Sequence, residues 1–257
     1  MKQSIALIGV GQMGAVFSHA LLRSGHPVIP VLRSTAIDEV EAQLPEPALT
    51  LVTVGEDDLQ PVLDGLPIGW RPSIALIQNE LLPRDWLRHG IESPTVAVVW
   101  FEKKPAHAPK VIIPTLVAGP RAGLLVDSLT SIDIPAVRIP DEQLIDVLVA
   151  KNLYILTANI VGLRTGGTVS ELWNRHREMA TAVVAEILDI QEWLVGGPVD
   201  RGEAIDGMTA AIHGDPDHGT TGRSAPRRLE RAINHARAAG ISTPYLDEIG
   251  HEAGLSV

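Results

Sequence analysis

The sequence predicts an α/β protein in which a mostly parallel sheet domain is followed by an all-helical domain. A glycine-rich turn, Gly9-x-Gly11-x-x-Gly14, follows a short apolar run and precedes an amphipathic stretch. Short apolar runs then alternate with helical patterns as far as Pro140, which is typical of a Rossmann-type sheet. Beyond Pro140 the apolar spacing is helical. We therefore expect a dinucleotide-binding Rossmann domain over residues 1–140 and a helical substrate or dimerisation domain over residues 141–257.

Composition excludes several classes of function. A chain of 257 residues with 45% hydrophobic and 20% charged residues is long enough for two domains with their own cores. The net charge of −10 argues against nucleic acid as a partner, because binding phosphates of a nucleic acid requires a basic surface. The absence of cysteine excludes disulfides, a thiolate nucleophile and cysteine-ligated metals.

The first residues resemble the start of a secretory signal, since Lys2 precedes an apolar run. Against that interpretation, glycines recur at cofactor-binding spacing and a second strand pattern follows directly. Gln12, Ser18 and His19 also interrupt the apolar stretch, which argues against a membrane span. We therefore expect a cytoplasmic protein with no membrane partner.

The glycine-rich turn lies inside a predicted β-α-β unit. Ser4 to Ile8 forms the first strand, the helix ends at Gly25, and His26 to Leu32 forms the second strand. The three glycines allow a tight turn, a close approach of the backbone to a pyrophosphate, and close packing of helix on strand. The helix start offers N–H groups and a positive dipole end to phosphates. The predicted contacts to the cofactor are Gly9, Gly11, Gln12, Met13 and Gly14.

The residue after the second strand selects the cofactor. An acid at this position holds the ribose hydroxyls of NAD, whereas an arginine accommodates the 2′-phosphate of NADP. Here Arg33 is followed by Ser34 and Thr35, and the first acid is Asp38. The sequence thus favours NADP (NADPH), with a solvated arginine at a strand end as the alternative.

The remaining elements of the first domain follow from apolar runs and turn residues. Asp57 or Asp58 is the expected N-cap of the third helix, and this role explains the acids better than a catalytic carboxylate pair. Pro114 predicts that its strand lies near an edge of the sheet. The further predicted strands are Ala48 to Val54, Ser73 to Ile77, Thr95 to Phe101, Val111 to Ala118 and Ala136 to Ile139, and the helices are Ile37 to Gln43, Leu59 to Leu63 and Arg121 to Leu129.

Asn79 follows the fourth strand, where the carboxyl ends of parallel strands line a ligand crevice. Its amide offers both a donor and an acceptor, which suits the cofactor amide or a substrate oxygen. The alternative is an asparagine that stabilises the next turn.

In the second domain a long helix begins with Asp141 as its N-cap and stops at Gly166-Gly167. Lys151 lies midway along this helix among apolar neighbours, where an ammonium is costly unless it meets a partner or a polar cavity. Asn159 lies about 80° further round the helix. The pair is suited to bind and protonate a carbonyl oxygen that receives hydride, and a snorkelling lysine is the alternative. The other predicted helices are Val169 to Val195, Asp200 to Ile212, Pro226 to Ala239 and Pro244 to Ala253.

The sequence resembles the ketopantoate reductase (2-dehydropantoate 2-reductase) family in the segments I-A-L-I-G-V-G-Q-M-G, I-A-L-I-Q-N-E-L-L and A-K-N-L-Y-I-L-T-A-N. The resemblance implies an NADPH-dependent oxidoreductase that reduces a small 2-oxo acid in a cleft between the domains. It implies that Lys151 is the catalytic acid, that Asn79, Asn159 and Thr221 contact substrate, and that Arg33 binds the 2′-phosphate. It is also compatible with a homodimer.

Other positions depart from the pattern of that family. Gly55 replaces a lysine that normally ends the third strand, Ile155 replaces an asparagine, and the acidic residue of the family has no clear match. Altered chemistry is therefore a second hypothesis, namely reduction of an imine (C=N) on the same scaffold. A third hypothesis is a non-catalytic NADP-binding sensor or partner protein.

Two features have more than one interpretation. Five arginines and one acid lie between Arg223 and Arg237. They could form a solvated helix face, an anion-binding rim or a subunit contact. The segment from His213 to His218 contains oxygen and nitrogen ligands, but a polar Gly/Pro-rich loop explains it more simply than a metal site. We therefore predict no metal.

Overall fold

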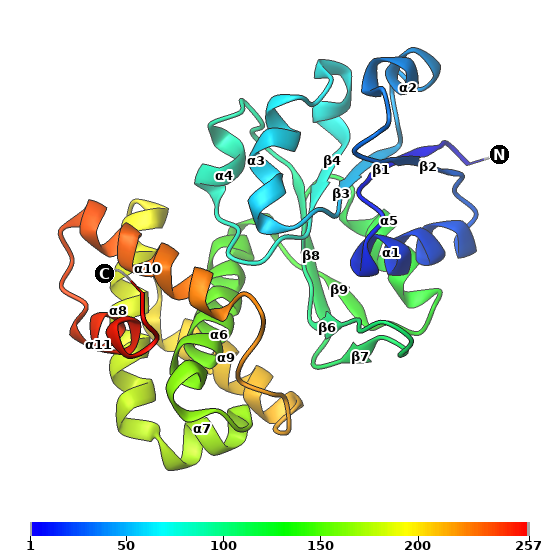
Figure 1. Ribbon diagram of the computed structural model, residues 1–257. Helices are drawn as coiled ribbons and strands as arrows, with labels where there is room; N and C mark the ends of the chain where they lie inside the picture. The colour runs from blue at the N-terminus through cyan, green and yellow to red at the C-terminus, as the bar shows by residue number, and fades with distance from the viewer. Residues whose placement is uncertain (1, 256–257) are drawn as a thin grey trace. The chain divides into compact units, whose positions relative to one another are not determined.

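The computed structural model describes residues 2–255. The chain divides into two compact units, Met1–Leu144 and Ile145–Val257, each of which is described by itself. The first unit is an α/β sheet domain and the second consists of helices (Figure 1). The predicted fold class, a Rossmann-type and mostly parallel sheet followed by an all-helical part, is confirmed.

Within the described residues, the first unit contains a sheet of seven strands in the order β2-β1-β3-β4-β5-β8-β9. Every neighbouring pair is parallel except β5 and β8, which are antiparallel. A short antiparallel pair, β6 and β7, lies outside this sheet. The strands are β1 Ile5–Ile8, β2 Val28–Val31, β3 Leu49–Val52, β4 Ile74–Leu76, β5 Thr95–Val98, β6 Phe101–Glu102, β7 Lys110–Val111, β8 Thr115–Ala118 and β9 Ala136–Arg138.

Helices cover both faces of this sheet, as buried parallel strands require (Figure 1). On one face α1 and α5 pack together over a core that includes Phe17, Leu21 and Leu125. The fully buried strands β1 and β4 are continuous apolar runs for this reason. The helices of this unit are α1 Gln12–Arg23, α2 Ile37–Gln43, α3 Glu56–Asp64, α4 Pro83–Leu87 and α5 Ala122–Thr130, with 3-10 turns at Ile68–Ser73 and Asp141–Gln143.

Two predicted strands are each divided in the structure. The apolar run that starts at Thr95 forms β5 and β6, and the run that includes Pro114 forms β7 and β8. The prediction that the strand containing Pro114 lies near an edge of the sheet is confirmed, because β8 is next to the edge strand β9. Pro114 falls in the break between β7 and β8, where no backbone N–H is needed for pairing.

Two predicted helix caps are wrong. Helix α3 begins at Glu56 with Gly55 as its N-cap, so Asp57 and Asp58 lie inside the first turn. Carboxylates there still interact favourably with the helix dipole. Asp141 belongs to a 3-10 turn, and its Oδ1 accepts the backbone N–H of Gly119 at 2.9 Å instead of capping α6.

The second unit is built around α6, whose buried residues extend over most of its length. The single helix predicted between Val169 and Val195 is two helices, α7 and α8, with a break at His176. No glycine or proline marks this break, and there the Arg177 guanidinium lies 4.2 Å from the centre of the Trp173 ring. The helices are α6 Leu144–Thr165, α7 Val169–Arg175, α8 Arg177–Val195, α9 Arg201–Gly214, α10 Ala225–Ala239 and α11 Pro244–Glu252.

Among the helices of residues 2–255, the segment Asp141–Thr165 is the one long and apolar enough to cross a membrane by length and composition. Of its most apolar window, 67% is buried inside the protein. Its position as the core helix of the second unit accounts for this hydrophobicity.

Candidate active site

The glycine-rich turn at the carboxyl end of β1 has the geometry that its spacing predicts. Gly9 has a φ of +87°, which favours glycine. A Cβ on Gly14 would collide with the carbonyl oxygen of Gly9 and would lie 2.7 Å from Thr53 Oγ1. A Cβ on Gly11 would meet nothing within 4 Å. The structure thus explains Gly14 by packing, whereas Gly11 faces open space.

The start of α1 is suited to an anion. Gly11 is its N-cap, no side chain forms a capping hydrogen bond, and no acid lies in the first turn. Gln12 is exposed and Met13 is partly buried. The first N–H groups of a helix point along its axis and carry a partial positive charge. This turn therefore fits the diphosphate of a dinucleotide.

Arg33 lies just beyond β2 with its side chain 88% exposed. Its Nη2 donates to Asp58 Oδ2 on α3 at 2.6 Å. The Thr35 hydroxyl accepts the backbone N–H of Leu32 at 2.9 Å, which fixes the turn after the strand. An exposed guanidinium at the end of β2 fits a phosphate on the adenosine ribose.

Asn79 lies beyond β4 and is tied to the start of α3. Its Nδ2 donates to Glu56 Oε1 at 3.1 Å. The neighbouring Gln78 is buried, and its Nε2 donates to the carbonyl oxygens of Val52 and Val54 at 2.9 and 3.2 Å. These bonds join the carboxyl ends of β3 and β4, so Asn79 has a fixed position at the edge where the glycine turn also lies.

Lys151 lies on α6 in the second unit, partly buried between the buried residues Ala150 and Asn152. Burial and, to a smaller extent, the positive charge of Arg228 together lower the pKa of Lys151 to about 7. An amine that titrates near neutral pH can both hold and release a proton under ordinary conditions.

Asn159, further along α6, is joined to α10 by Arg228. Arg228 Nη1 donates to Asn159 Oδ1 at 2.9 Å. Arg228 is only 9% exposed, which is rare for an arginine. Figure 1 shows α10 crossing α6 in this unit. The structure therefore joins Asn159 to Arg228, and the charge of Arg228 acts on Lys151.

Arg228 is not among the site residues expected from the sequence, where it is one of five arginines with three open interpretations. A signal was nevertheless present in the spacing. Arg228 falls on the apolar stripe of α10, whose other buried members are Ala225, Leu229, Ala232, Ile233 and Ala236. A charged residue on the buried stripe of an amphipathic helix indicates a special role.

The segment before α10 runs along α6. The backbone N–H and the hydroxyl of Thr220 both donate to the Gly167 carbonyl oxygen at 3.1 Å. A Cβ on Gly162 would lie 2.6 Å from the Thr220 Cβ, so the close approach requires glycine. A Cβ on Gly222 would lie 3.6 Å from Asn159 Oδ1. Thr221, the predicted substrate contact, is exposed between the anchored Thr220 and Gly222.

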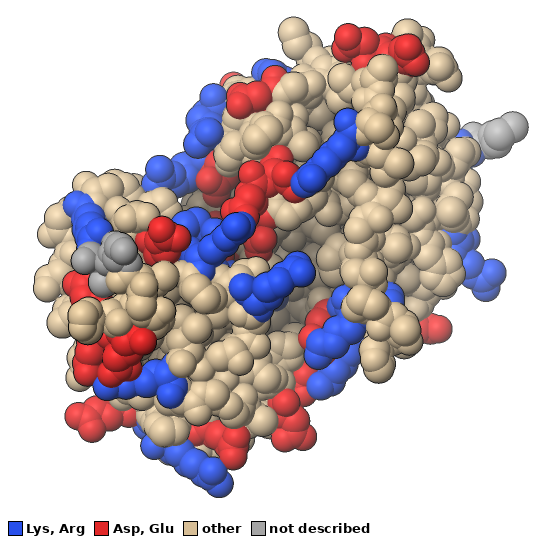
Figure 2. All heavy atoms as spheres, in the orientation of Figure 1, with Lys and Arg blue, Asp and Glu red and all other residues tan. Residues whose placement is uncertain are grey.

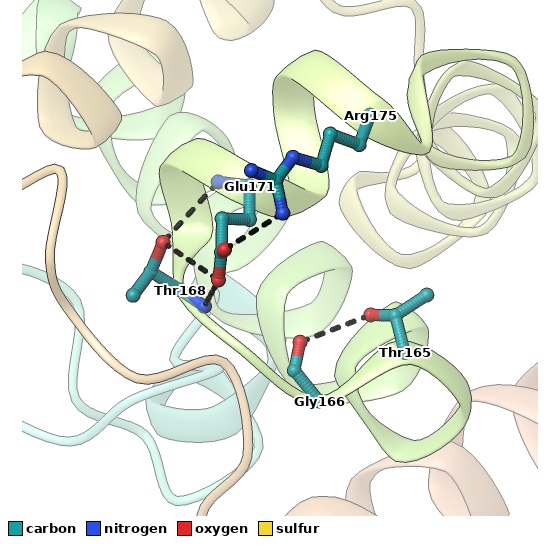
Figure 3. A network of polar contacts seen from close by, with 5 residues as sticks. All are labelled: Thr165, Gly166, Thr168, Glu171 and Arg175. Carbon is teal, nitrogen blue, oxygen red and sulfur yellow. Dashed lines mark hydrogen bonds and ion pairs between the residues drawn. The ribbon is translucent and has the colours of Figure 1, made fainter.

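The turn between α6 and α7 is fixed by the network in Figure 3. The Thr168 hydroxyl accepts the Glu171 N–H at 3.2 Å, and Glu171 Oε2 accepts the Thr168 N–H at 3.1 Å. Arg175 donates to Glu171 Oε1 at 3.0 Å, and the Thr165 hydroxyl donates to the Gly166 carbonyl oxygen at 3.2 Å. Because this turn also presents the carbonyl that holds Thr220, it positions the segment next to Asn159.

The segment from His213 to His218 has a structural role. The carbonyl oxygens of Pro216 and His218 accept the first N–H groups of α7. His218 Nδ1 lies 3.4 Å from Oδ2 of the buried Asp215. Among residues 2–255, no three His, Asp or Glu side chains lie close enough together to hold a metal.

The first unit thus has a Rossmann-type fold, and the second unit consists of helices, one of which carries Lys151. No protein-family model matches the sequence, and no curated protein sequence matches it. Solved structures do match in fold over nearly the whole chain. The 2-dehydropantoate 2-reductase of Methylococcus capsulatus has a TM-score of 0.71 at 14% identity, over 98% of this chain and 96% of that chain.

Two further structures have the same fold. The dimeric ketopantoate reductase of Staphylococcus aureus has a TM-score of 0.68 at 16% identity, over 96% of each chain. A D-mandelate dehydrogenase in a ternary complex with NADH and anilino(oxo)acetate has a TM-score of 0.67 at 15% identity, over 96% of each chain. The fold implied by the sequence resemblance to ketopantoate reductases is therefore confirmed.

Proposed function

We propose that the protein is an NADPH-dependent oxidoreductase that reduces a small 2-oxo acid to a 2-hydroxy acid. The observation that carries this proposal is the partly buried Lys151, whose pKa is lowered to about 7. It shares helix α6 with Asn159, in a fold that is also found in ketopantoate reductases and in D-mandelate dehydrogenase. The neighbours reduce or oxidise such compounds according to their names, which supports the assignment.

The cofactor would be held by residues of the first unit. Backbone N–H groups at the glycine turn and at Gln12 and Met13 would bind the diphosphate. Arg33 would exchange its contact with Asp58 for the 2′-phosphate, which favours NADP over NAD. Asn79 would contact the nicotinamide end or the substrate, with its amide oriented by Glu56.

Lys151 would hold and then donate the proton of the reaction. A reduced nicotinamide supplies a hydride to the carbonyl carbon. In its ammonium form Lys151 binds the oxo oxygen, stabilises the negative charge that develops there, and transfers a proton directly or through water. The product is a 2-hydroxy acid and a neutral lysine, which solvent protonates again. The reaction requires the carbonyl carbon to reach the nicotinamide.

Asn159 would orient the substrate. Because its oxygen accepts from Arg228, its NH₂ group is turned away from the guanidinium and is available as a donor. Thr221 is a further proposed contact, since it lies between Thr220, which is anchored on Gly167, and Gly222, which lies near Asn159.

A panel of substrates tests this function. Purified protein with NADPH would be mixed in turn with small 2-oxo acids, neutral ketones, and cyclic and acyclic imines, and cofactor oxidation would be followed by absorbance. We expect turnover with one or more 2-oxo acids. Turnover confined to imines would instead support the C=N reductase hypothesis. NADPH binding without turnover on the whole panel would support a non-catalytic sensor, and either result would refute the proposal.

The compartment and the oligomeric state remain predictions. We propose a cytoplasmic enzyme. A homodimer is the state of one structural neighbour, the Staphylococcus aureus enzyme, and light scattering on the purified protein would establish whether this chain shares it.

A further inference from the structure

Arg228 is a buried cation on the inner face of an amphipathic helix. Its neighbours on the stripe, Ala225, Leu229 and Ala232, are all buried. Removal of a guanidinium from water is costly, and proteins tolerate it where an anion or several acceptors compensate. The arginines of α10 therefore lie on two different faces of the helix. Arg227 is exposed, while Arg228 points to α6. Figure 2 shows basic side chains over the region of α10 on the surface.

The contact with Asn159 orients the guanidinium. One Nη1–H donates to the neutral amide oxygen at 2.9 Å. This bond fixes the plane of the guanidinium relative to α6. The same bond turns the Asn159 NH₂ group to the side opposite the guanidinium. Two kinds of donor, a planar cation and an amide, are thus held in a fixed relation.

A second cation lies near the first. The charge of Arg228 is close enough to Lys151 to disfavour its protonated form. Two positive groups from α6 and α10 in one partly buried region repel each other, and a bound anion would offset that repulsion. A guanidinium is the group that matches the two oxygens of a carboxylate.

We infer that Arg228 is the carboxylate-binding residue of the second unit, and that it selects small 2-oxo monocarboxylates over neutral carbonyl compounds. The carboxylate would bind Arg228 with help from the Asn159 NH₂ group, and the oxo oxygen would face Lys151. This inference rests on the proposed function for the reaction, but carboxylate binding itself does not depend on turnover. Of the three interpretations of the arginines between Arg223 and Arg237, it assigns anion binding to one member, Arg228.

The experiment measures binding and turnover separately. Oxamate is a carboxylate with an adjacent amide in place of a reducible carbonyl, so its affinity for the NADPH-loaded protein can be measured by calorimetry. We expect Arg228→Gln to weaken oxamate binding by about 10- to 100-fold, in line with the loss of a charge-assisted hydrogen-bond pair. Arg227→Gln on the exposed face is the matched control and should bind oxamate like the wild type.

A second variant covers the case in which Arg228→Gln fails to fold. Arg228→Lys keeps the charge but loses the planar fork, and we expect oxamate binding weaker by about threefold or more. Circular dichroism and NADPH affinity, both expected to match the wild type, verify that each variant is folded. In turnover, the KM for a 2-oxo acid should rise in both variants, by a larger factor than the KM for a neutral ketone.

The outcomes separate the two claims. No oxamate binding by the wild type, or wild-type affinity in the folded variants, would overturn the role of Arg228. Oxamate binding that depends on Arg228, without reduction of any 2-oxo acid, would support this inference and refute the proposed function. Reduction of 2-oxo acids with an unchanged KM in Arg228→Gln would support the proposed function and refute this inference.

Discussion

The guanidinium of Arg228 donates to the amide oxygen of Asn159 at 2.9 Å and thereby joins α10 to α6, the helix that carries Lys151. The contact joins two polar residues in the second unit, where most of α6 is buried and apolar. It explains why an asparagine and an arginine are tolerated there. It also places a fixed positive charge near the amine that we propose as the acid.

Arg33 determines the choice between NADPH and NADH in our account. We expect Arg33→Ala to weaken NADPH binding by about 10- to 100-fold, since a charge-assisted contact to the 2′-phosphate is lost. NADH, which lacks that phosphate, should bind within about twofold of the wild type. Fluorescence titration of both cofactors measures the ratio. Arg23→Ala, an exposed arginine at the end of α1, is the control. An unchanged ratio in Arg33→Ala would remove the NADP assignment.

Two glycines of the turn should respond differently to alanine. In Gly11→Ala the new methyl group meets nothing within 4 Å, so we expect stability within about 0.5 kcal/mol of the wild type but strongly reduced NADPH binding. In Gly14→Ala the methyl group collides with the Gly9 carbonyl and approaches Thr53 Oγ1. That variant should lose about 1–3 kcal/mol of stability as well as cofactor binding. Thermal melts with and without NADPH distinguish the two. Full NADPH binding by Gly11→Ala would show that no phosphate lies at this turn.

The pH profile reports the proton on Lys151. Burial, with the charge of Arg228, lowers the pKa of this amine to about 7. Below that pH the ammonium is present and can donate, and above it the neutral amine cannot. We therefore expect kcat/KM for a 2-oxo acid to be level below pH 7 and to fall about tenfold per pH unit above it.

Arg228→Gln provides a check on this assignment. Removal of the nearby positive charge should raise the pKa of Lys151 and shift the descending limb to higher pH. A descending limb at the same pH in wild type and variant would mean that another group titrates.

Glu186 on α8 stabilises the start of α11. Its two carboxylate oxygens accept the backbone N–H groups of Tyr245 and Leu246 at 2.8 and 2.9 Å. We expect Glu186→Ala to lower the free energy of unfolding by about 2–4 kcal/mol, because two buried donors lose their acceptor. Glu186→Gln keeps one acceptor and should lose less. Urea denaturation measures both, with Glu178→Ala on the exposed first turn of α8 as the control. An effect of Glu186→Ala no larger than that of Glu178→Ala would contradict this role.

The first β-α-β unit could be predicted in detail because glycine spacing encodes backbone geometry directly. The crowding of Gly14 and the open space at Gly11 follow the roles that the motif assigns. The antiparallel pairing of β8 with β5 could not be predicted, since it depends on contacts between segments distant in the sequence. The break at His176 has no glycine or proline, and the helical spacing continues across it.

The candidate site, too, could be predicted only in part. Lys151 and Asn159 could be singled out because they interrupt an apolar helix at a spacing that places them on similar sides. The side chain that contacts Asn159 comes from α10, and sequence distance gave no indication of that pairing. The spacing of the α10 stripe contained the relevant signal, but it was obscured by the four other arginines nearby.

The turnover of Lys151→Ala tests the central claim most directly. With saturating NADPH and the best 2-oxo acid of the panel, we predict a fall in kcat of at least about 100-fold, as expected for the loss of a general acid. NADPH affinity, which depends on the first unit, should stay within about twofold of the wild type. Wild-type kcat in this variant would contradict the proposed role of Lys151.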